Sequence, residues 1–216
     1  MENNSKSPVG LSKQAILRLP NYLQHLKKMK RQGVMMAAAS VIAADLRLNE
    51  VQVRKDLAAV SSLPGKPKMG FQIDPLIHDI EEFLGYHNVN EAILVGCGSL
   101  GTALLNFTGF RALGLQIVAA FDSAEEKCNV AIGDKPVLPM DKMQSLCRRL
   151  NVHIGIITTP ADAAQKIADE MIECGILAIW NFAPVRIVVP KGILVHNENM
   201  AASLALLSKH LKERLD

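Results

Sequence analysis

Glycines at positions 96, 98 and 101 form a G-x-G-x-x-G motif, and Asp122 lies 21 residues beyond the last of them. Glycine permits a tight turn and, because it lacks a Cβ, lets the backbone approach a bulky anion closely. Free N–H groups at the start of a following helix, with the positive end of its dipole, can hold a pyrophosphate. An acid at this distance can accept hydrogen bonds from a ribose hydroxyl. These residue types at this spacing indicate dinucleotide binding.

The segments around the motif support this interpretation. Residues 91–95 and 115–121 are apolar runs typical of buried parallel strands, and residues 99–112 between them have a helical pattern. A carboxylate beside the ribose repels a 2′-phosphate, so Asp122 predicts NAD(H) rather than NADP(H). Lys127 lies five residues past the strand end, which is a poor position for a phosphate clamp. Because glycine-rich turns are common, a Rossmann-like unit that binds another nucleotide, or none, is the alternative.

Length and composition limit the class of protein. The chain has 216 residues, of which 49% are hydrophobic, enough for one large or two modest domains. No apolar run reaches the ~18–20 residues that a membrane span needs, and the polar start lacks a signal-peptide apolar region. The four cysteines have no C-x-x-C spacing. We therefore expect a cytoplasmic protein with reduced, buried thiols, no metal site and no membrane association.

Charge is distributed unevenly along the chain. The net charge is only +3, but the first 72 residues hold 12 Lys and Arg against four Asp and Glu, a net charge of +8. The remaining residues therefore carry a net charge of −5. This asymmetry indicates a basic module joined to a mildly acidic one. The alternative is a solvated basic face without a partner.

Three helices are predicted in the basic module. The first covers residues 12–31, with Pro20 starting its main part at the N1 position. The second is a short helix that ends near Leu46 and has Ser40 as its N-cap. Asn49 caps the third, residues 50–61. Two short helices joined by a tight turn are typical of a helix-turn-helix.

The third helix carries side chains suited to DNA. Its apolar residues form one inward stripe, which leaves Gln52, Arg54, Lys55 and Asp56 to face outward. Glutamine suits adenine edges, and arginine or lysine suits guanine and phosphate. The turn-rich loop over residues 62–71 has the size and charge of a wing. The predicted DNA-binding residues are Gln52, Arg54, Lys55, Lys66 and Lys68. An ordinary small helical domain with a loop is the alternative.

The remaining chain predicts an α/β domain. Apolar strands at residues 153–158, 176–180, 186–189 and 193–196 alternate with helices at residues 141–150, 159–174 and 198–214. This alternation predicts a mostly parallel sheet with helices on both faces, and ligand groups gather at the carboxyl ends of its strands. The predicted cofactor-binding residues are Gly96, Cys97, Gly98, Ser99, Leu100, Gly101, Asp122, Thr159, Pro160, Asn181 and Phe182.

These elements divide the chain into four parts. We expect a winged-helix DNA-binding domain over residues 1–73 and a linker helix over residues 74–86, which Asp74 and Pro75 start. A Rossmann dinucleotide-binding domain follows over residues 87–197, and a C-terminal helix over residues 198–216.

Several motifs occur together in one order along the chain. They are Arg18-Leu19-Pro20, Val53-Arg54-Lys55-Asp56-Leu57, the glycine motif, Ala119-Ala120-Phe121-Asp122, Thr159-Pro160-Ala161-Asp162-Ala163-Ala164-Gln165, Asn181-Phe182-Ala183-Pro184-Val185 and Val195-His196-Asn197-Glu198-Asn199. With them the chain resembles the Rex family of NAD(H)-sensing bacterial transcriptional repressors. The resemblance implies a winged helix followed by a Rossmann domain, in a homodimer that swaps its C-terminal helix. It further implies binding to inverted-repeat operators that NADH, but not NAD+, releases.

The chain departs from the family pattern at four positions that couple NADH to domain movement. Gln24 and Ala201 stand where the family has an arginine and an aspartate that pair across the dimer, so that ion pair cannot form. Phe107 replaces an aromatic hydroxyl near the cofactor, and Ala202 replaces an aromatic residue near the nicotinamide. These departures predict poor release of DNA by NADH. The alternative function is therefore a paralogue that binds NAD(H) but has lost redox-dependent release.

Two other classes of function are weighed against the repressor. An NAD-dependent oxidoreductase needs a general acid or base near the nicotinamide. His153 and His196 lie near strand ends, but neither has an evident orienting partner, and the chain has no separate substrate domain. We therefore predict no catalytic residues. A nucleotide-binding protein whose winged helix contacts another protein is the third possibility, because the wing sequence is atypical.

Overall fold

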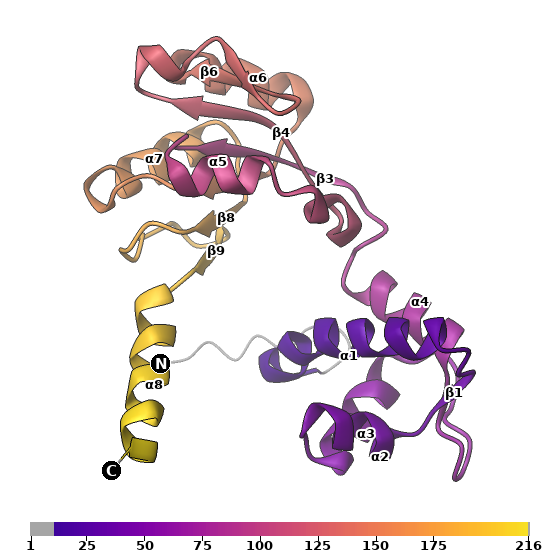
Figure 1. Ribbon diagram of the computed structural model, residues 1–216. Coiled ribbons are helices and arrows are strands. Elements are labelled where there is room, and N and C mark those ends of the chain that lie inside the picture. The colour runs from indigo at the N-terminus through magenta and orange to yellow at the C-terminus, as the bar shows by residue number, and fades with distance from the viewer. Residues whose placement is uncertain (1–10, 216) are drawn as a thin grey trace. The chain divides into compact units, whose positions relative to one another are not determined.

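The computed structural model describes residues 11–215 (Figure 1). The chain divides between His87 and Asn88 into two compact units. The first ten residues of the predicted DNA-binding domain and the last residue of the predicted C-terminal helix lie outside the described residues.

From residue 11 onward, the N-terminal unit is built from four helices and two short strands. In chain order they are α1 (Lys13–Arg31), β1 (Met36–Ala37), α2 (Ala39–Leu46), α3 (Glu50–Val60), β2 (Phe71–Gln72) and α4 (Ile73–Phe83). Its core gathers fully buried side chains from each of the four helices, among them Tyr22, Ile42, Leu57 and Leu76. Burial of such side chains contributes roughly 1.5–3 kcal/mol each, which stabilises helices too short to persist alone.

Helix α1 is continuous through Pro20, so the predicted break at that residue is wrong. Ser12 caps the helix, its Oγ accepting a hydrogen bond from the N–H of Ala15 at 3.2 Å. A proline inside a helix costs about 3 kcal/mol. Leu19 and Tyr22, on either side of Pro20, are both fully buried, and their packing outweighs that cost.

The helix-turn-helix forms as predicted, with one difference in capping. Asn49 caps α3, its Oδ1 accepting from the N–H of Gln52 at 3.1 Å. The predicted cap of α2 is wrong, because Ala38 is the N-cap and Ser40 lies in the first turn. Arg47, in the left-handed conformation at φ 54°, ends α2 and starts the turn.

Residues 61–71 form a hairpin wing. Lys66 and Gly70 pair through two backbone hydrogen bonds, of 2.7 and 2.9 Å, and β2 pairs antiparallel with β1. Gly70 has φ +83°, and a Cβ there would lie 2.1 Å from the carbonyl oxygen of Ala37. Only glycine fits where the wing returns to the sheet.

Helix α4 belongs to the N-terminal core, although we predicted a linker helix. It begins at Ile73 with Gln72 as its N-cap, one residue before the predicted start at Asp74. Its buried side chains include Leu76 and Ile80 and share one cluster with α1 and α3. The apolar stripe that suggested a helix therefore serves packing within this unit.

The C-terminal unit is an α/β domain around a seven-stranded sheet, in the order β5-β6-β4-β3-β7-β8-β9. Its strands are β3 (Asn90–Val95), β4 (Leu115–Asp122), β5 (Val130–Ile132), β6 (Lys135–Pro139), β7 (Ile154–Ile157), β8 (Ala178–Asn181) and β9 (Leu194–Asn197). Only β5 runs antiparallel to its neighbour. The predicted mostly parallel sheet is confirmed.

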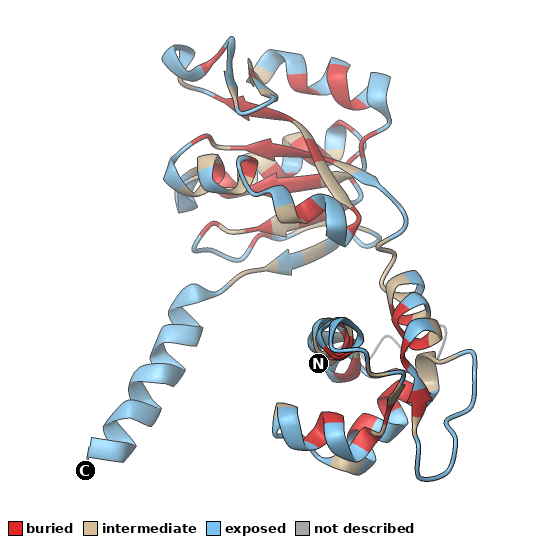
Figure 2. Ribbon diagram, turned by 45° about the vertical axis from the view of Figure 1, so that its right-hand side comes forward, coloured by how far each residue is buried: buried red, intermediate tan, exposed pale blue. Residues whose placement is uncertain are grey.

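Helices cover both faces of this sheet, and Figure 2 shows that its central strands are largely buried. The helical elements are α5 (Ser99–Leu105), η1 (Thr108–Leu113), η2 (Glu125–Lys127), η3 (Met140–Lys142), α6 (Met143–Leu150), α7 (Ala161–Glu173) and α8 (Met200–Leu215). Ile93 and Val95 of β3 face α6 and α7, while Ala92 and Leu94 face α5 and η1. This alternation explains why β3 is a continuous apolar run.

Two predicted elements of this unit are wrong. The helix expected over residues 99–112 is instead α5 followed by η1. The strand expected over residues 186–189 is a loop. The side chain of Gln165 bonds to the backbone of this loop at Val188: it accepts from the N–H at 2.8 Å and donates to the carbonyl at 2.9 Å.

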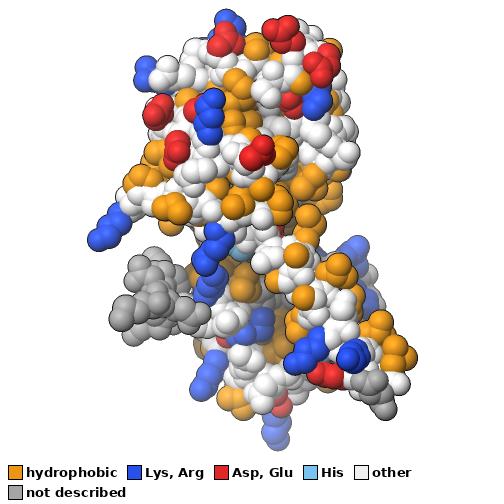
Figure 3. All heavy atoms as spheres, turned by 90° about the vertical axis from the view of Figure 1, so that its left-hand side faces the viewer, with side chains coloured by type: hydrophobic (Ala, Val, Ile, Leu, Met, Phe, Trp, Pro, Cys, Tyr) orange, Lys and Arg blue, Asp and Glu red, His pale blue; other side chains and the backbone are white. Residues whose placement is uncertain are grey.

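Helix α8 has no buried residue (Figure 2). Its leucines are largely exposed, including Leu204 at 63% and Leu207 at 66%, and hydrophobic side chains lie at its surface (Figure 3). In the described part of the chain, no helix combines the length and apolarity that crossing a bilayer requires.

Candidate functional sites

The glycine motif is the turn between β3 and α5, and its three glycines have different reasons to be glycine. Gly96 has φ +103°, and a Cβ there would lie 2.9 Å from backbone atoms of Thr158. A Cβ on Gly101 would lie 2.0 Å from the carbonyl oxygen of Gly96. A Cβ on Gly98 would meet no atom within 4 Å. The protein's own packing therefore requires Gly96 and Gly101, whereas Gly98 faces open space.

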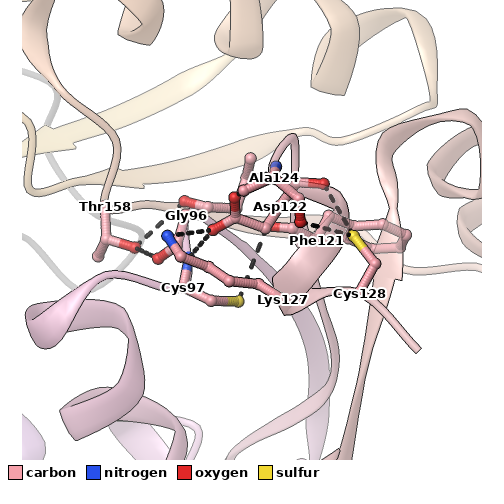
Figure 4. Close-up of polar contacts among 9 residues, drawn as sticks. Gly96, Cys97, Phe121, Asp122, Ala124, Lys127, Cys128 and Thr158 are labelled. Atoms are coloured by element: carbon pink, nitrogen blue, oxygen red, sulfur yellow. Dashed lines mark hydrogen bonds and ion pairs between the residues drawn. The ribbon is translucent and has the colours of Figure 1, made fainter. Parts of the chain in front are cut away.

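Asp122 lies at the carboxyl end of β4, beside this turn (Figure 4). Its Oδ2 accepts from the N–H of Cys97 at 2.7 Å, and its Oδ1 accepts from the N–H of Ala124 at 2.9 Å. Burial raises the pKa of this carboxyl, but the Ala124 and Cys97 N–H groups and the Lys127 ammonium outweigh burial, so the net pKa is lowered. Asp122 is therefore ionised at neutral pH and fixed in orientation.

Lys127 also lies at this site, although we predicted it to be a poor phosphate clamp. The short η2 turns the chain back after β4, so that Nζ of Lys127 is 3.4 Å from Oδ2 of Asp122 (Figure 4). The sequence signal for this turn is the charged run Glu125-Glu126-Lys127 directly after the strand. The ammonium and the carboxylate together make this end of the site polar and nearly neutral.

A cavity of about 470 Å³ opens over the glycine turn. Its lining brings together five of the predicted cofactor-binding residues: Gly96, Gly98, Asp122, Thr159 and Pro160. Lys127, Met140 and Ile167 are among the residues that complete it. Oγ1 of Thr159 is buried and has no hydrogen-bond partner among the described residues. An open space over Gly98 and an unsatisfied hydroxyl on another lining residue suit a polar ligand.

The other six predicted residues do not line this cavity. They are Cys97, Ser99, Leu100, Gly101, Asn181 and Phe182. Asn181 is fully buried, and its Nδ2 donates to the Val185 carbonyl at 2.7 Å and to Oδ1 of Asn197 at 2.9 Å. Its Oδ1 accepts from the N–H of Ala183 at 3.0 Å. These bonds give Asn181 a structural role in holding the loop after β8.

Burial explains the state of the Cys97 thiol. Burial raises the pKa of Cys97 to about 11, with the neighbouring Asp122 carboxylate as a further cause. The thiol is therefore protonated at neutral pH.

His196 does have an acidic partner, which the sequence did not reveal. Its Nε2 is 3.2 Å from Oε1 of Glu198, the oxygen that also accepts from Nε1 of Trp180 at 2.9 Å. Neither His196 nor Glu198 lines the cavity over the glycine turn. The pair instead ties the end of β9 to β8.

The second candidate site is the exposed surface of α3 and the wing. All five predicted DNA-binding residues are exposed. Arg54, Lys66 and Lys68 line a groove of about 450 Å³ between α3, the wing and the start of α2. Arg54 also forms an ion pair with Glu50, one turn earlier on α3. Three cations along one groove suit a polyanion.

Asp56 is not part of this surface, although we expected it to face outward. It is 5% exposed and lies against α1. Its Oδ2 is 2.7 Å from Nη2 of Arg18 and accepts from the Tyr22 hydroxyl at 2.9 Å. Burial, followed by the hydrogen bond to Asp56, raises the pKa of Tyr22 to about 12. This buried network explains why the Arg18 and Asp56 motifs occur together.

Comparisons with known proteins match both units of the chain. The family model described as "Putative DNA-binding protein N-terminus" matches residues 10–58, and the one described as "CoA binding domain" matches residues 87–185. A crystal structure of RSP in complex with β-NAD+ and operator DNA superposes with a TM-score of 0.88 at 28% identity, covering 94% of each chain. RSP in complex with β-NADH superposes with a TM-score of 0.84, at 28% identity over 94% of this chain and 95% of that one.

The fold and the sites therefore define a two-domain protein with an N-terminal winged helix-turn-helix and a Rossmann domain. Redox-sensing transcriptional repressors named Rex are similar to this chain in sequence. The one from Treponema denticola is 39% identical, covering 89% of this chain and 91% of the relative. That from Porphyromonas gingivalis is 40% identical, with coverages of 90% and 89%. That from Bacteroides fragilis is 37% identical, with coverages of 95% and 93%. The chain belongs to the Rex family.

Proposed function

We propose that this protein is a DNA-binding transcriptional repressor that binds NAD(H) and responds to the NADH/NAD+ balance of the cytoplasm. The observation that carries the proposal is the combination, in one chain, of a cation-lined groove along α3 and the wing and a cavity over a dinucleotide-type glycine turn. Its relatives are named redox-sensing repressors. The protein has no enzymatic role in this proposal, since His196 and Glu198 lie outside the cavity.

DNA binding is tested by electrophoretic shift on inverted repeats selected from a random-sequence pool. The groove cations displace counterions from phosphates, so the affinity falls steeply as salt rises. We expect a shift at low salt that is lost between about 50 and 200 mM salt. If no selected inverted repeat is retained at low salt, the DNA-binding proposal is wrong.

Replacing Lys55 should weaken binding to all DNA sequences. Lys55 is exposed on α3 between Arg54 and the buried Asp56. We expect Lys55→Ala to lower the affinity about five- to tenfold and to reduce the slope of log affinity against log salt by about 1. The measurement is a salt titration of DNA binding. Lys28→Ala, an exposed lysine on α1, is the control; equal losses in the two variants would remove Lys55 from the interface.

The residues around the glycine turn fit NAD(H). The N–H groups at the start of α5 would hold the pyrophosphate above Gly98, and Asp122 and Lys127 would contact the adenosine ribose. Thr159, with its unpartnered hydroxyl, would supply a further hydrogen bond. The nicotinamide ring of the cofactor would be either oxidised or reduced, and the protein would respond to which of the two forms is bound.

Removing the Asp122 carboxylate should change the preference between the two cofactors. In the native chain the carboxylate repels a 2′-phosphate and neutralises Lys127. In Asp122→Ser, the Lys127 ammonium loses that partner and becomes available to a phosphate. We expect the ratio of NADH to NADPH affinity to fall by about tenfold or more, measured by calorimetric titration of both. In the double variant with Lys127→Met, the NADPH gain should disappear; an unchanged ratio in Asp122→Ser would contradict the assigned role of the acid.

We also propose that the protein is a homodimer that pairs through α8. The support is the exposure of the whole helix with its apolar residues, among them Leu204, Leu207 and Leu211. A free apolar helix face is costly in water, and a second copy of this chain would cover it. Sedimentation equilibrium tests this proposal: the native chain should be a dimer, and Leu207→Glu, which puts a charge in the apolar face, should be a monomer.

A further inference from the structure

The guanidinium of Arg18, on α1, contacts two residues that lie one turn apart on α3. Nε and Nη2 reach Oδ2 of Asp56, at 2.8 and 2.7 Å. Nη1 and Nη2 both face one atom of the Gln52 side-chain amide, each at 3.1 Å. Arginine carries only hydrogen-bond donors, so the amide atom of Gln52 that faces it is the carbonyl oxygen, with the NH2 group turned away.

Arg18 is held firmly in this position. Its Nε also donates to the Tyr22 hydroxyl at 3.2 Å, and that hydroxyl donates to Asp56. Tyr22 and Asp56 are both buried, and the Arg18 side chain is only 18% exposed. Burial lowers the pKa of Arg18, but its bonds to Asp56 and Tyr22 outweigh burial and raise it, so the guanidinium is charged at every working pH. Arg18 is therefore held in place beside the Gln52 amide.

This contact decides which hydrogen bonds Gln52 can offer to DNA. Gln52 is exposed near the N-terminus of α3, the part of a recognition helix that reaches base edges. A free glutamine pairs with adenine by donating to N7 and accepting from N6. With its oxygen engaged by Arg18, Gln52 can only donate. Guanine presents two acceptors, N7 and O6, in the major groove.

We propose that Arg18 determines base specificity by acting through Gln52, which it commits to reading guanine instead of adenine. The inference rests on the proposed DNA-binding function and names the base that one residue of its interface recognises. It replaces the expectation from residue type alone, in which Gln52 suits adenine. Arg18 is a positioning residue here, and Gln52 makes the base contact.

The test compares base preference in three variants with that of the native chain. Selection from a random inverted-repeat pool, with Gln52→Ala run in parallel, identifies the base pair that Gln52 reads. We expect the native chain to favour guanine over adenine there by about tenfold. Arg18→Lys keeps a charge for Asp56 but cannot bracket the amide oxygen with two donors, so that preference should fall by about tenfold. Gln52→Glu keeps the contact with Arg18 but has no N–H, so its preference should move to cytosine, whose N4 donates.

Modified bases and a matched variant separate this effect from a general loss of binding. Inosine keeps N7 and O6 and should replace guanine without loss, whereas 7-deazaguanine lacks N7 and should weaken binding by the native chain. Arg31→Lys, the same substitution at the exposed end of α1, should leave base preference unchanged. Circular dichroism establishes that each variant is folded.

The outcomes distinguish the inference from the function on which it rests. If the native chain binds no selected inverted repeat, the proposed function fails and the inference fails with it. If the native chain binds but prefers adenine at the Gln52 position, only the inference is overturned. The same holds if Arg18→Lys is folded and keeps the native guanine preference.

Discussion

Gly98→Val should abolish dinucleotide binding while leaving the protein folded. The backbone at Gly98 is extended, with φ −74° and ψ −169°, which valine adopts easily, and its Cβ would meet no protein atom within 4 Å. The added methyl groups would instead occupy the space above the turn, where the pyrophosphate is expected. Losing two hydrogen bonds to a charged group costs about 3–6 kcal/mol, so the NADH affinity should fall about a hundredfold or more.

The measurement uses energy transfer from Trp180, the single tryptophan of the chain, to bound NADH. Gly101→Val is the matched control, because a Cβ there would lie 2.0 Å from the carbonyl oxygen of Gly96. That variant should lose binding together with stability, whereas Gly98→Val should keep its unfolding temperature. Retained NADH affinity in folded Gly98→Val would show that the cofactor does not pass over this turn.

Asp56→Ala should destabilise the N-terminal unit by about 3 kcal/mol or more. The change leaves the largely buried Arg18 guanidinium and the Tyr22 hydroxyl without their shared acceptor, and breaking such a buried pair typically costs 3–5 kcal/mol. For a unit of this size, we expect its unfolding temperature to fall by about 10–20 °C. DNA binding should be lost at temperatures where the native chain still binds.

The chain allows the two units to be observed separately. Trp180 lies in the C-terminal unit, while both tyrosines, Tyr22 and Tyr86, lie in the N-terminal unit. In Asp56→Ala, tyrosine absorbance should therefore report early unfolding while Trp180 fluorescence and NADH affinity stay unchanged. Lys55→Ala serves as the neighbouring control and should leave both transitions in place. A tyrosine transition at the native temperature in Asp56→Ala would show that the Arg18 network contributes little.

The strand-turn-helix around the glycine motif could be predicted because its signals come from residues that are close together in the sequence. Apolar runs, glycines and a terminal acid at this fixed spacing predict a nucleotide-binding turn. The structure places Gly96, Gly98 and Asp122 around one cavity. Asn49 was identified as a cap for the same reason, since its side chain bonds to the backbone only three residues away.

Several of the errors involve partners distant in sequence. Asp56 looks like an outward residue on a helical wheel, and only contact with Arg18, 38 residues earlier, buries it. Lys127 reaches Asp122 because η2 reverses the chain, and α4 is a core helix because α1 packs on it. Helical periodicity gives which face is apolar but not which element covers it.

Our proposal that NADH weakens DNA binding by this protein competes with the poor release that Gln24, Phe107, Ala201 and Ala202 predict. The most direct test is a DNA-binding titration on the selected inverted repeat, with NADH and NAD+ added separately at equal concentrations. The proposed function predicts that NADH lowers the bound fraction while NAD+ leaves it in place, since a ligand shifts an equilibrium only through differential binding. Equal effects of the two forms, with both shown to bind, would contradict redox sensing and favour the ligand-indifferent paralogue that Gln24, Phe107, Ala201 and Ala202 suggest.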